Sequence, residues 1–121
     1  MRSLKALVID DDEIVCTLLG DFLTKQGHQA TTHTSPRLGM SAARNQVFDV
    51  VFLDIRMPEL DGLQVLREMR PLLPKAAFVM ITASADDERV GEALSAGAGF
   101  CLSKPFDSAM VAEILAVLLG G

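Results

Sequence analysis

The chain has 121 residues, of which 50% are hydrophobic and 22% are charged, as expected of one globular domain. Its formal net charge of −5 argues against direct nucleic-acid binding, because contact with a phosphate backbone needs a basic surface. The apolar stretches 76–81 and 109–119 are too short to span a bilayer, so no membrane partner is expected. Cys16 and Cys101 show no metal-ligand spacing, and with no signal-peptide pattern we expect a cytoplasmic protein.

Five short apolar runs predict strands, and each run is followed by a segment with helical periodicity or helix-capping residues. This alternation predicts an α/β fold in which a parallel sheet carries helices on both faces. The predicted strands span residues 4–9, 28–33, 49–53, 76–81 and 100–103. The predicted helices span residues 12–26, 35–46, 62–73, 86–95 and 108–119. In the first helix, two rows of apolar residues predict one buried face: Ile14, Leu18 and Phe22, and Val15, Leu19 and Leu23.

An acid, Asp54, ends the most apolar strand of the chain. Residues 49–53 are typical of a strand buried on both faces, and open α/β sheets bind ligands outside the carboxyl ends of their strands. Pro58 prevents the strand from continuing, and Asp61-Gly62 supplies turn and helix-start chemistry. We therefore expect a short, rigid loop to present Asp54 at the mouth of the sheet.

Chemistry-bearing residues follow four of the five predicted strands, at the edge where the carboxyl ends of parallel strands meet. They are Asp10 and Asp11, Asp54, Thr82 and Lys104. Three neighbouring carboxylates raise one another's pKa unless a cation compensates them. Because all the ligands are oxygens, we expect a hard cation, Mg²⁺. A carboxylate beside Mg²⁺ and an ammonium group can attack a phosphoryl group, so the constellation predicts phosphoryl transfer to Asp54.

Taken together, Asp10-Asp11, the loop 54–62, Thr82-Ala83 and Lys104-Pro105-Phe106 resemble the receiver domain of two-component response regulators. The resemblance covers essentially the whole chain and implies a single receiver domain over residues 1–121. The fold that it implies is a doubly wound, flavodoxin-like (βα)5 fold with strand order 2-1-3-4-5.

The implied function is a phosphorylation-controlled signalling switch. A sensor histidine kinase would donate a phosphoryl group to Asp54 in a Mg²⁺-dependent reaction. The surface formed by the fourth helix, the fifth strand and the fifth helix would then change. Such a domain assists its own phosphorylation and dephosphorylation and is not otherwise an enzyme.

The resemblance also implies a role for each matching residue. Asp54 corresponds to the phosphoacceptor, Asp11 to the direct Mg²⁺ ligand and Asp10 to its companion. The backbone carbonyl of Arg56 lies where the family provides a further metal ligand.

At the other two strand ends, Thr82, followed by Ala83, corresponds to the switch hydroxyl, and Lys104 to the phosphate-binding lysine. The Lys104–Pro105 bond is expected in cis.

One position departs from the family pattern. Cys101 stands where the family usually has its switch aromatic, three residues before Lys104. Phe100 is one residue earlier, so the two-residue period of a strand points it to the opposite face of the sheet. Signalling that relies on Thr82 and the loop after the fourth strand is the alternative to the usual threonine–aromatic coupling.

Other functions remain open from the residues alone. Acids 10–12 also fit a helix N-terminal cluster. A phosphate-independent receiver-like interaction module would be marked by loss of an acid, Thr82 or Lys104, and all are present. A haloacid-dehalogenase-type enzyme would use an Asp-x-Asp pattern after the first strand, but this chain is short for such an enzyme. A flavin or nucleotide binder would need a phosphate-binding loop where this chain has acids.

The last predicted helix carries aliphatic residues around its whole circumference. Between Met110 and Leu119 the one charged residue is Glu113. A helix of this kind is normally buried on more than one side. We therefore expect its outer face to contact a second copy of the chain, as a homodimer, or an output domain outside this sequence. An ordinary scatter of exposed aliphatics is the alternative.

Overall fold

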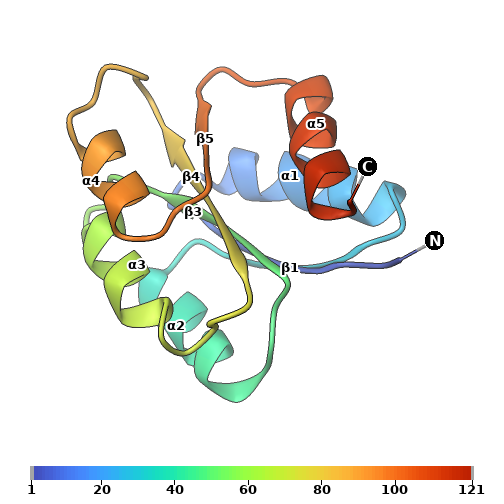
Figure 1. Cartoon of the computed structure of the whole chain (residues 1–121), viewed down its shortest axis with the longest axis horizontal. Helices are drawn as coiled ribbons and strands as arrows, with labels where there is room; N and C mark the ends of the chain where they lie inside the picture. The colour runs from blue at the N-terminus through green and yellow to red at the C-terminus, as the bar shows by residue number, and fades with distance from the viewer. Residues whose placement is uncertain (1, 121) are drawn as a thin grey trace.

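Five parallel strands form one sheet in the order β2-β1-β3-β4-β5, which confirms the predicted fold and strand order (Figure 1). The computed structural model describes residues 2–120. The strands are β1 (Lys5–Ile9), β2 (Gln29–His33), β3 (Val50–Asp54), β4 (Ala77–Thr82) and β5 (Phe100–Ser103). The helices are α1 (Glu13–Lys25), α2 (Pro36–Asn45), α3 (Gly62–Met69), α4 (Arg89–Ser95) and α5 (Ser108–Leu118).

The helices cover both faces of the sheet, α1 and α5 on one and α2, α3 and α4 on the other (Figure 1). Strand β3 is buried along its whole length and shows how the two cores divide. Val51 and Leu53 belong to the core under α2, α3 and α4, whereas Val50 and Phe52 belong to the core under α1 and α5. This alternation follows from the two-residue period of a strand. It explains why a central parallel strand is apolar at nearly every position.

Two helices are shorter than the sequence predicts. α3 ends at Met69 rather than near residue 73, because Pro71 has no amide hydrogen to donate to the Arg67 carbonyl and so interrupts the helical hydrogen bonds. Arg70 itself keeps helical backbone angles. α4 begins at Arg89 rather than at residue 86, since residues 84–87 form a turn in which the Asp87 amide donates to the Ser84 carbonyl. The loop after β4 is therefore longer than predicted.

The predicted buried face of α1 is wrong in part. Ile14 and Leu18 are 68% and 65% exposed, and the buried residues are Cys16, Leu19 and Leu23. At about 100° per residue, Ile14 and Leu18 lie on the side of the helix opposite Cys16 and Leu23. The apolar residues do recur at i, i+4 spacing, but the face of α1 that packs against the sheet is centred on Cys16, Leu19 and Leu23.

The last helix keeps an apolar outer surface. Val111, Ile114 and Leu115 are buried against the sheet, while Met110 and Val117 are 40% and 61% exposed. Within residues 2–120, no helix is long and apolar enough to cross a bilayer.

Candidate functional site

The carboxyl ends of β1, β3, β4 and β5 bring the predicted site residues to one edge of the sheet. Carboxylate oxygens of Asp10, Asp11 and Asp54 lie within 4.8 Å of one another. A cavity of about 270 Å³ opens at this edge and is lined by Asp11, Asp12, Asp54, Arg56, Thr82, Ala83 and Lys104. Asp12 caps α1 by accepting a hydrogen bond from the Ile14 amide at 2.9 Å.

Asp10 is completely buried, and only one of its two carboxylate oxygens accepts a hydrogen bond from the described residues. Its Oδ1 accepts a hydrogen bond from the Asp12 amide at 2.9 Å. No group within residues 2–120 donates a hydrogen bond to its Oδ2, which lies 3.3 Å from the Lys104 ammonium nitrogen. A buried carboxylate oxygen without a hydrogen-bond donor is costly, because it has lost its water without a full replacement. The Asp10 carboxylate therefore favours additional positive charge nearby.

Asp54 is the last residue of β3, and its carboxylate is almost completely buried. Oδ1 accepts a hydrogen bond from the Arg56 amide at 3.1 Å, and Oδ2 lies 3.8 Å from the Lys104 nitrogen. Burial, followed by repulsion from Asp10, raises the pKa of Asp54 to about 7. The Arg56 amide and Lys104 oppose this rise in pKa without cancelling it.

The charges at this edge are unbalanced. Burial alone would lower the pKa of Lys104, but the Asp10 and Asp54 carboxylates outweigh it and raise that pKa. Three carboxylates face one ammonium group, which leaves two negative charges uncompensated when all are ionised. Oxygen ligands with this excess charge suit a divalent hard cation. The donor set and the unsatisfied Asp10 oxygen therefore fit Mg²⁺.

The loop after β3 is held rigidly below Asp54. Ile55 and Met57 are buried in the core, and Asp61 caps α3 by accepting from the Leu63 amide at 2.9 Å. The Gly62 amide donates to the Ile55 carbonyl at 2.7 Å. A Cβ atom on Gly62 would lie 1.9 Å from the Asp54 carbonyl oxygen, so only glycine allows this close approach.

Thr82 ends β4 with its hydroxyl already engaged. Its Oγ1 donates to the Ser84 carbonyl at 2.9 Å and accepts from the Ser84 amide at 3.2 Å. The Lys104 amide donates to the Thr82 carbonyl at 2.7 Å, which ties the ends of β4 and β5 together. The Lys104–Pro105 peptide bond is cis.

Cys101 and Phe100 lie on opposite faces of β5. Cys101 is in register with Met80, which belongs to the core under α2, α3 and α4. Phe100 is in register with Val79 and packs into the other core. Phe100 therefore does not share the sheet face of Cys101, as the strand period predicted.

Two ion pairs near the site were not anticipated from the sequence. The Arg56 guanidinium donates to both oxygens of Asp87, from Nε at 2.7 Å and from Nη2 at 3.2 Å. Arg89, the first residue of α4, pairs with the helix cap Asp61. The first pair joins the loop after β3 to the loop after β4, and the second joins it to the first residue of α4. The partners are 28 and 31 residues apart, so no local pattern signals these pairs.

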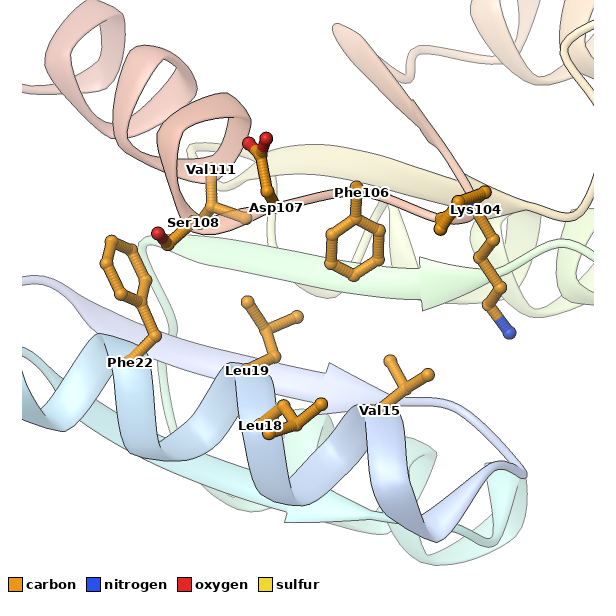
Figure 2. A pocket seen from close by; sticks show the side chains of 10 residues that line it. Val15, Leu18, Leu19, Phe22, Lys104, Phe106, Asp107, Ser108 and Val111 are labelled. Atoms are coloured by element: carbon orange, nitrogen blue, oxygen red, sulfur yellow. The ribbon is translucent and has the colours of Figure 1, made fainter.

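An apolar groove of about 470 Å³ lies beside the site, between α1 and the segment that joins β5 to α5 (Figure 2). Its α1 wall includes Leu18, which is one of the exposed residues of that helix. Lys104 lies at one end of the groove, where its ammonium group points away from Phe22 (Figure 2).

Comparisons with known proteins agree with this geometry. The sequence matches the model of the response regulator receiver domain family over residues 6–116. The transcriptional regulatory protein ZraR of Escherichia coli K12 is 38% identical over 105 residues, which are 87% of this chain and 24% of ZraR. The chain thus spans about a quarter of that relative's length. The chemotaxis protein CheY of Thermotoga maritima is 31% identical over 92% of this chain and 93% of CheY.

A solved structure shows the same fold with a metal bound. It is the receiver domain of the sensor histidine kinase PA1611 from Pseudomonas aeruginosa PAO1, with a magnesium ion coordinated in its active-site cleft. It is 26% identical, has a TM-score of 0.86, and the match covers 99% of this chain and 100% of that one. From its matched sequence, its strand order and its acidic edge, the chain belongs to the response regulator receiver domain family of two-component signalling.

Proposed function

We propose that residues 1–121 form a single receiver domain that accepts a phosphoryl group from a sensor histidine kinase onto Asp54 in a Mg²⁺-dependent reaction. The observation that carries this proposal is the position of Asp54 between the acidic pair Asp10-Asp11 and a lysine. Carboxylate oxygens of Asp54, Asp10 and Asp11 lie within 4.8 Å of one another, so that one metal ion could contact all three. Asp54 Oδ2 lies 3.8 Å from the Lys104 nitrogen. On this proposal the domain is regulatory and promotes only its own phosphorylation and dephosphorylation.

The proposed Mg²⁺ ligands are Asp11, Asp54 and the backbone carbonyl of Arg56, with Asp10 orienting the site. The excess negative charge and the unsatisfied Asp10 Oδ2 support this assignment. When bound, Mg²⁺ would neutralise the carboxylates and the oxygens of the transferring phosphoryl group.

In the proposed transfer, an Asp54 carboxylate oxygen forms the bond to phosphorus. The bond from phosphorus to the histidine nitrogen of the kinase breaks, and that nitrogen keeps the electron pair. The Lys104 ammonium, 3.8 Å from Asp54 Oδ2, would stabilise negative charge on the phosphoryl oxygens. Because the attack requires ionised Asp54, the raised pKa of this carboxyl makes charge compensation a condition of the reaction.

The proposed switch begins at Thr82 and Ala83, which line the same cavity as Asp54. After transfer, the Thr82 hydroxyl and the Ala83 amide would bind phosphoryl oxygens. This contact would bias an equilibrium between two arrangements of α4, β5 and α5. The ends of three neighbouring strands carry Asp54, Thr82 and Lys104. The phosphoryl group would therefore contact residues from all three strand ends.

The proposed partners of this chain, which we expect to be cytoplasmic, are a sensor histidine kinase and either an output domain or a second copy of the chain. ZraR is about four times as long as the matched segment, which supports an output domain outside this sequence. The exposed Met110 and Val117 on α5 support an apolar contact at this surface.

A phosphate-independent interaction module is the second candidate. The observation that favours it is Cys101, which leaves no aromatic ring on its face at this position of β5. In that case partner binding would not respond to Asp54.

The direct test is intact mass after incubation with acetyl phosphate, with and without Mg²⁺, on the wild-type chain and on Asp54→Asn. The proposal expects a gain of one phosphoryl group that requires both Mg²⁺ and Asp54. No gain on the wild-type chain under any condition would contradict phosphorylation and favour the phosphate-independent module.

A further inference from the structure

Hydrogen bonds that are linked through residues Arg56 and Asp87 connect the Asp54 carboxylate to the Thr82 hydroxyl. Asp54 Oδ1 accepts from the Arg56 amide at 3.1 Å, and the Arg56 guanidinium donates to Asp87 at 2.7 and 3.2 Å. The Asp87 amide donates to the Ser84 carbonyl at 3.1 Å. The Thr82 hydroxyl donates to that same carbonyl at 2.9 Å. The path therefore leaves the loop after β3 and enters the loop after β4.

Asp87 connects the two loops along this path. Its side chain is only 7% exposed, although it belongs to a loop at the surface. Each of its two oxygens accepts a hydrogen bond from Arg56, and Oδ1 also accepts from the Arg89 amide at 3.0 Å. A guanidinium that binds both oxygens of a carboxylate fixes orientation as well as distance. Asp87 is therefore held by the loop that carries Asp54 and by the first residue of α4.

The Thr82 hydroxyl has a single hydrogen, and the Ser84 carbonyl uses it. Donation to a phosphoryl oxygen on Asp54 requires that this bond be released. The Ser84 carbonyl is also held by the Asp87 amide, and Asp87 is tied to Arg56. A rearrangement that moves the Ser84 carbonyl away from the hydroxyl therefore either breaks the bond from the Asp87 amide or moves Asp87, and moving Asp87 strains the Arg56–Asp87 pair.

We propose that Asp87 is a positioning residue that, through Arg56, holds the loop after β4 in the arrangement in which the Thr82 hydroxyl is unavailable. The pair thereby sets how readily a phosphoryl group on Asp54 engages the switch. This inference rests on the proposed function and names the contact that regulates it. It also provides a route from Asp54 to α4 that does not pass through the Cys101 position.

The test is a double-mutant cycle on Arg56→Lys and Asp87→Asn. Arg56→Lys keeps the positive charge but cannot bind both Asp87 oxygens. The probe is beryllofluoride, an analogue of the phosphoryl group, titrated with Mg²⁺ and followed by the amide NMR signals of Ala83 and Ser84. Each single substitution is expected to raise the apparent affinity about two- to fivefold, in line with the modest strength of an ion pair whose arginine is largely exposed.

Non-additive effects of the two substitutions would show that Arg56 and Asp87 act through their mutual contact. Additive effects would mean that each residue acts separately, for example through its charge. If the Arg56–Asp87 pair holds the loop after β4, Arg56→Lys raises the affinity for beryllofluoride in the wild-type chain but does not change it in the Asp87→Asn background. An equal effect in both backgrounds, or no effect in the wild-type chain, would overturn the inference. Arg2→Gln is the matched control, because Arg2 is 62% exposed against 61% for Arg56 and also pairs with an aspartate, Asp49. This control is expected to bind like the wild-type chain.

Failure of the inference is distinguishable from failure of the proposed function. If the wild-type chain binds no beryllofluoride, the proposed function is contradicted. The Ala83 and Ser84 amide signals of the metal-free proteins then still test whether the Arg56–Asp87 pair holds the loop after β4. They are expected to shift in Asp87→Asn and in Arg56→Lys, and unchanged signals in both variants would overturn the inference.

Discussion

The buried carboxylate of Asp10 and the ammonium group of Lys104 lie 3.3 Å apart, and Lys104 also lies 3.8 Å from Asp54. Lys104 is thus the cation shared by two buried acids that repel each other. Its side chain is 28% exposed, so water screens these interactions only in part. In the absence of a metal, this lysine holds the acidic edge together.

Lys104→Met should therefore destabilise the chain most when no metal is present. At pH 8 in EDTA, urea unfolding is expected to show a loss of about 1–3 kcal/mol, since a buried charge pair has lost one partner. Millimolar Mg²⁺ should restore part of this loss by compensating the same carboxylates. Lys75→Met, at an exposed lysine, is the control. An equal loss in both variants would show that Lys104 does not compensate the acids.

Asp54→Asn should change the pH dependence of stability in EDTA. The Asp54 pKa is about 7 in the folded chain against 3.8 for an ordinary aspartate, so the folded state holds a proton that the unfolded chain releases. Stability contributed by protonated Asp54 is complete at low pH and is lost as pH rises from about 4 to about 7. Asparagine does not titrate and avoids this loss.

The stabilisation by Asp54→Asn should therefore be small at pH 4 and reach about 2–4 kcal/mol at pH 8. Urea unfolding across this pH range measures it. A difference between the two proteins that does not vary with pH would contradict the raised pKa.

Gly62→Ala should disturb the loop that carries Asp54. The added methyl group would lie 1.9 Å from the Asp54 carbonyl oxygen, a backbone atom that cannot move aside without displacing β3. A loss of roughly 1–3 kcal/mol in unfolding free energy is expected, together with slower phosphorylation by acetyl phosphate.

Gly91→Ala is the matched control for Gly62→Ala, because a methyl group on this α4 residue meets no atom within 4 Å. It should stabilise the chain by about 0.5–1 kcal/mol, since alanine favours the helix. If both substitutions behaved alike, the close contact at Gly62 would not matter.

The two cysteines should differ in reactivity. Burial raises the pKa of the Cys16 thiol to about 11, and its Sγ lies 3.2 Å from the Asp10 carbonyl oxygen, to which it donates. Because the thiolate is the reactive form, iodoacetamide at pH 8 should modify the partly exposed Cys101 well before Cys16. Peptide mapping over time measures both rates. Equal rates in the folded protein would contradict the closed packing of α1 against β1.

The fold and the position of the site could be predicted because both follow from short-range patterns. Apolar runs mark the strands, and parallel strands bring their carboxyl ends to one edge. Asp10, Asp54, Thr82 and Lys104 each follow such a run directly, so their proximity needs no knowledge of loop conformation.

Features that depend on loop conformation could not be predicted in this way. The Arg56–Asp87 pair requires a turn at residues 84–87, of which the last two were predicted to begin a helix. The exposure of Ile14 and Leu18 depends on how α1 is rotated against the sheet, which the spacing of apolar residues does not fix. The raised pKa of Asp54 depends on burial beside Asp10, a property of the folded sheet.

The central claim is that Asp54 itself receives the phosphoryl group. Borohydride reduces an acyl phosphate to an alcohol, so phosphorylated aspartate becomes homoserine, which fragment-ion mass spectrometry can locate in the sequence. After acetyl phosphate and Mg²⁺, homoserine is expected at position 54 alone, and none is expected when Mg²⁺ is withheld. Homoserine at Asp10 or Asp11 instead, or no homoserine in a fully folded sample, would contradict it.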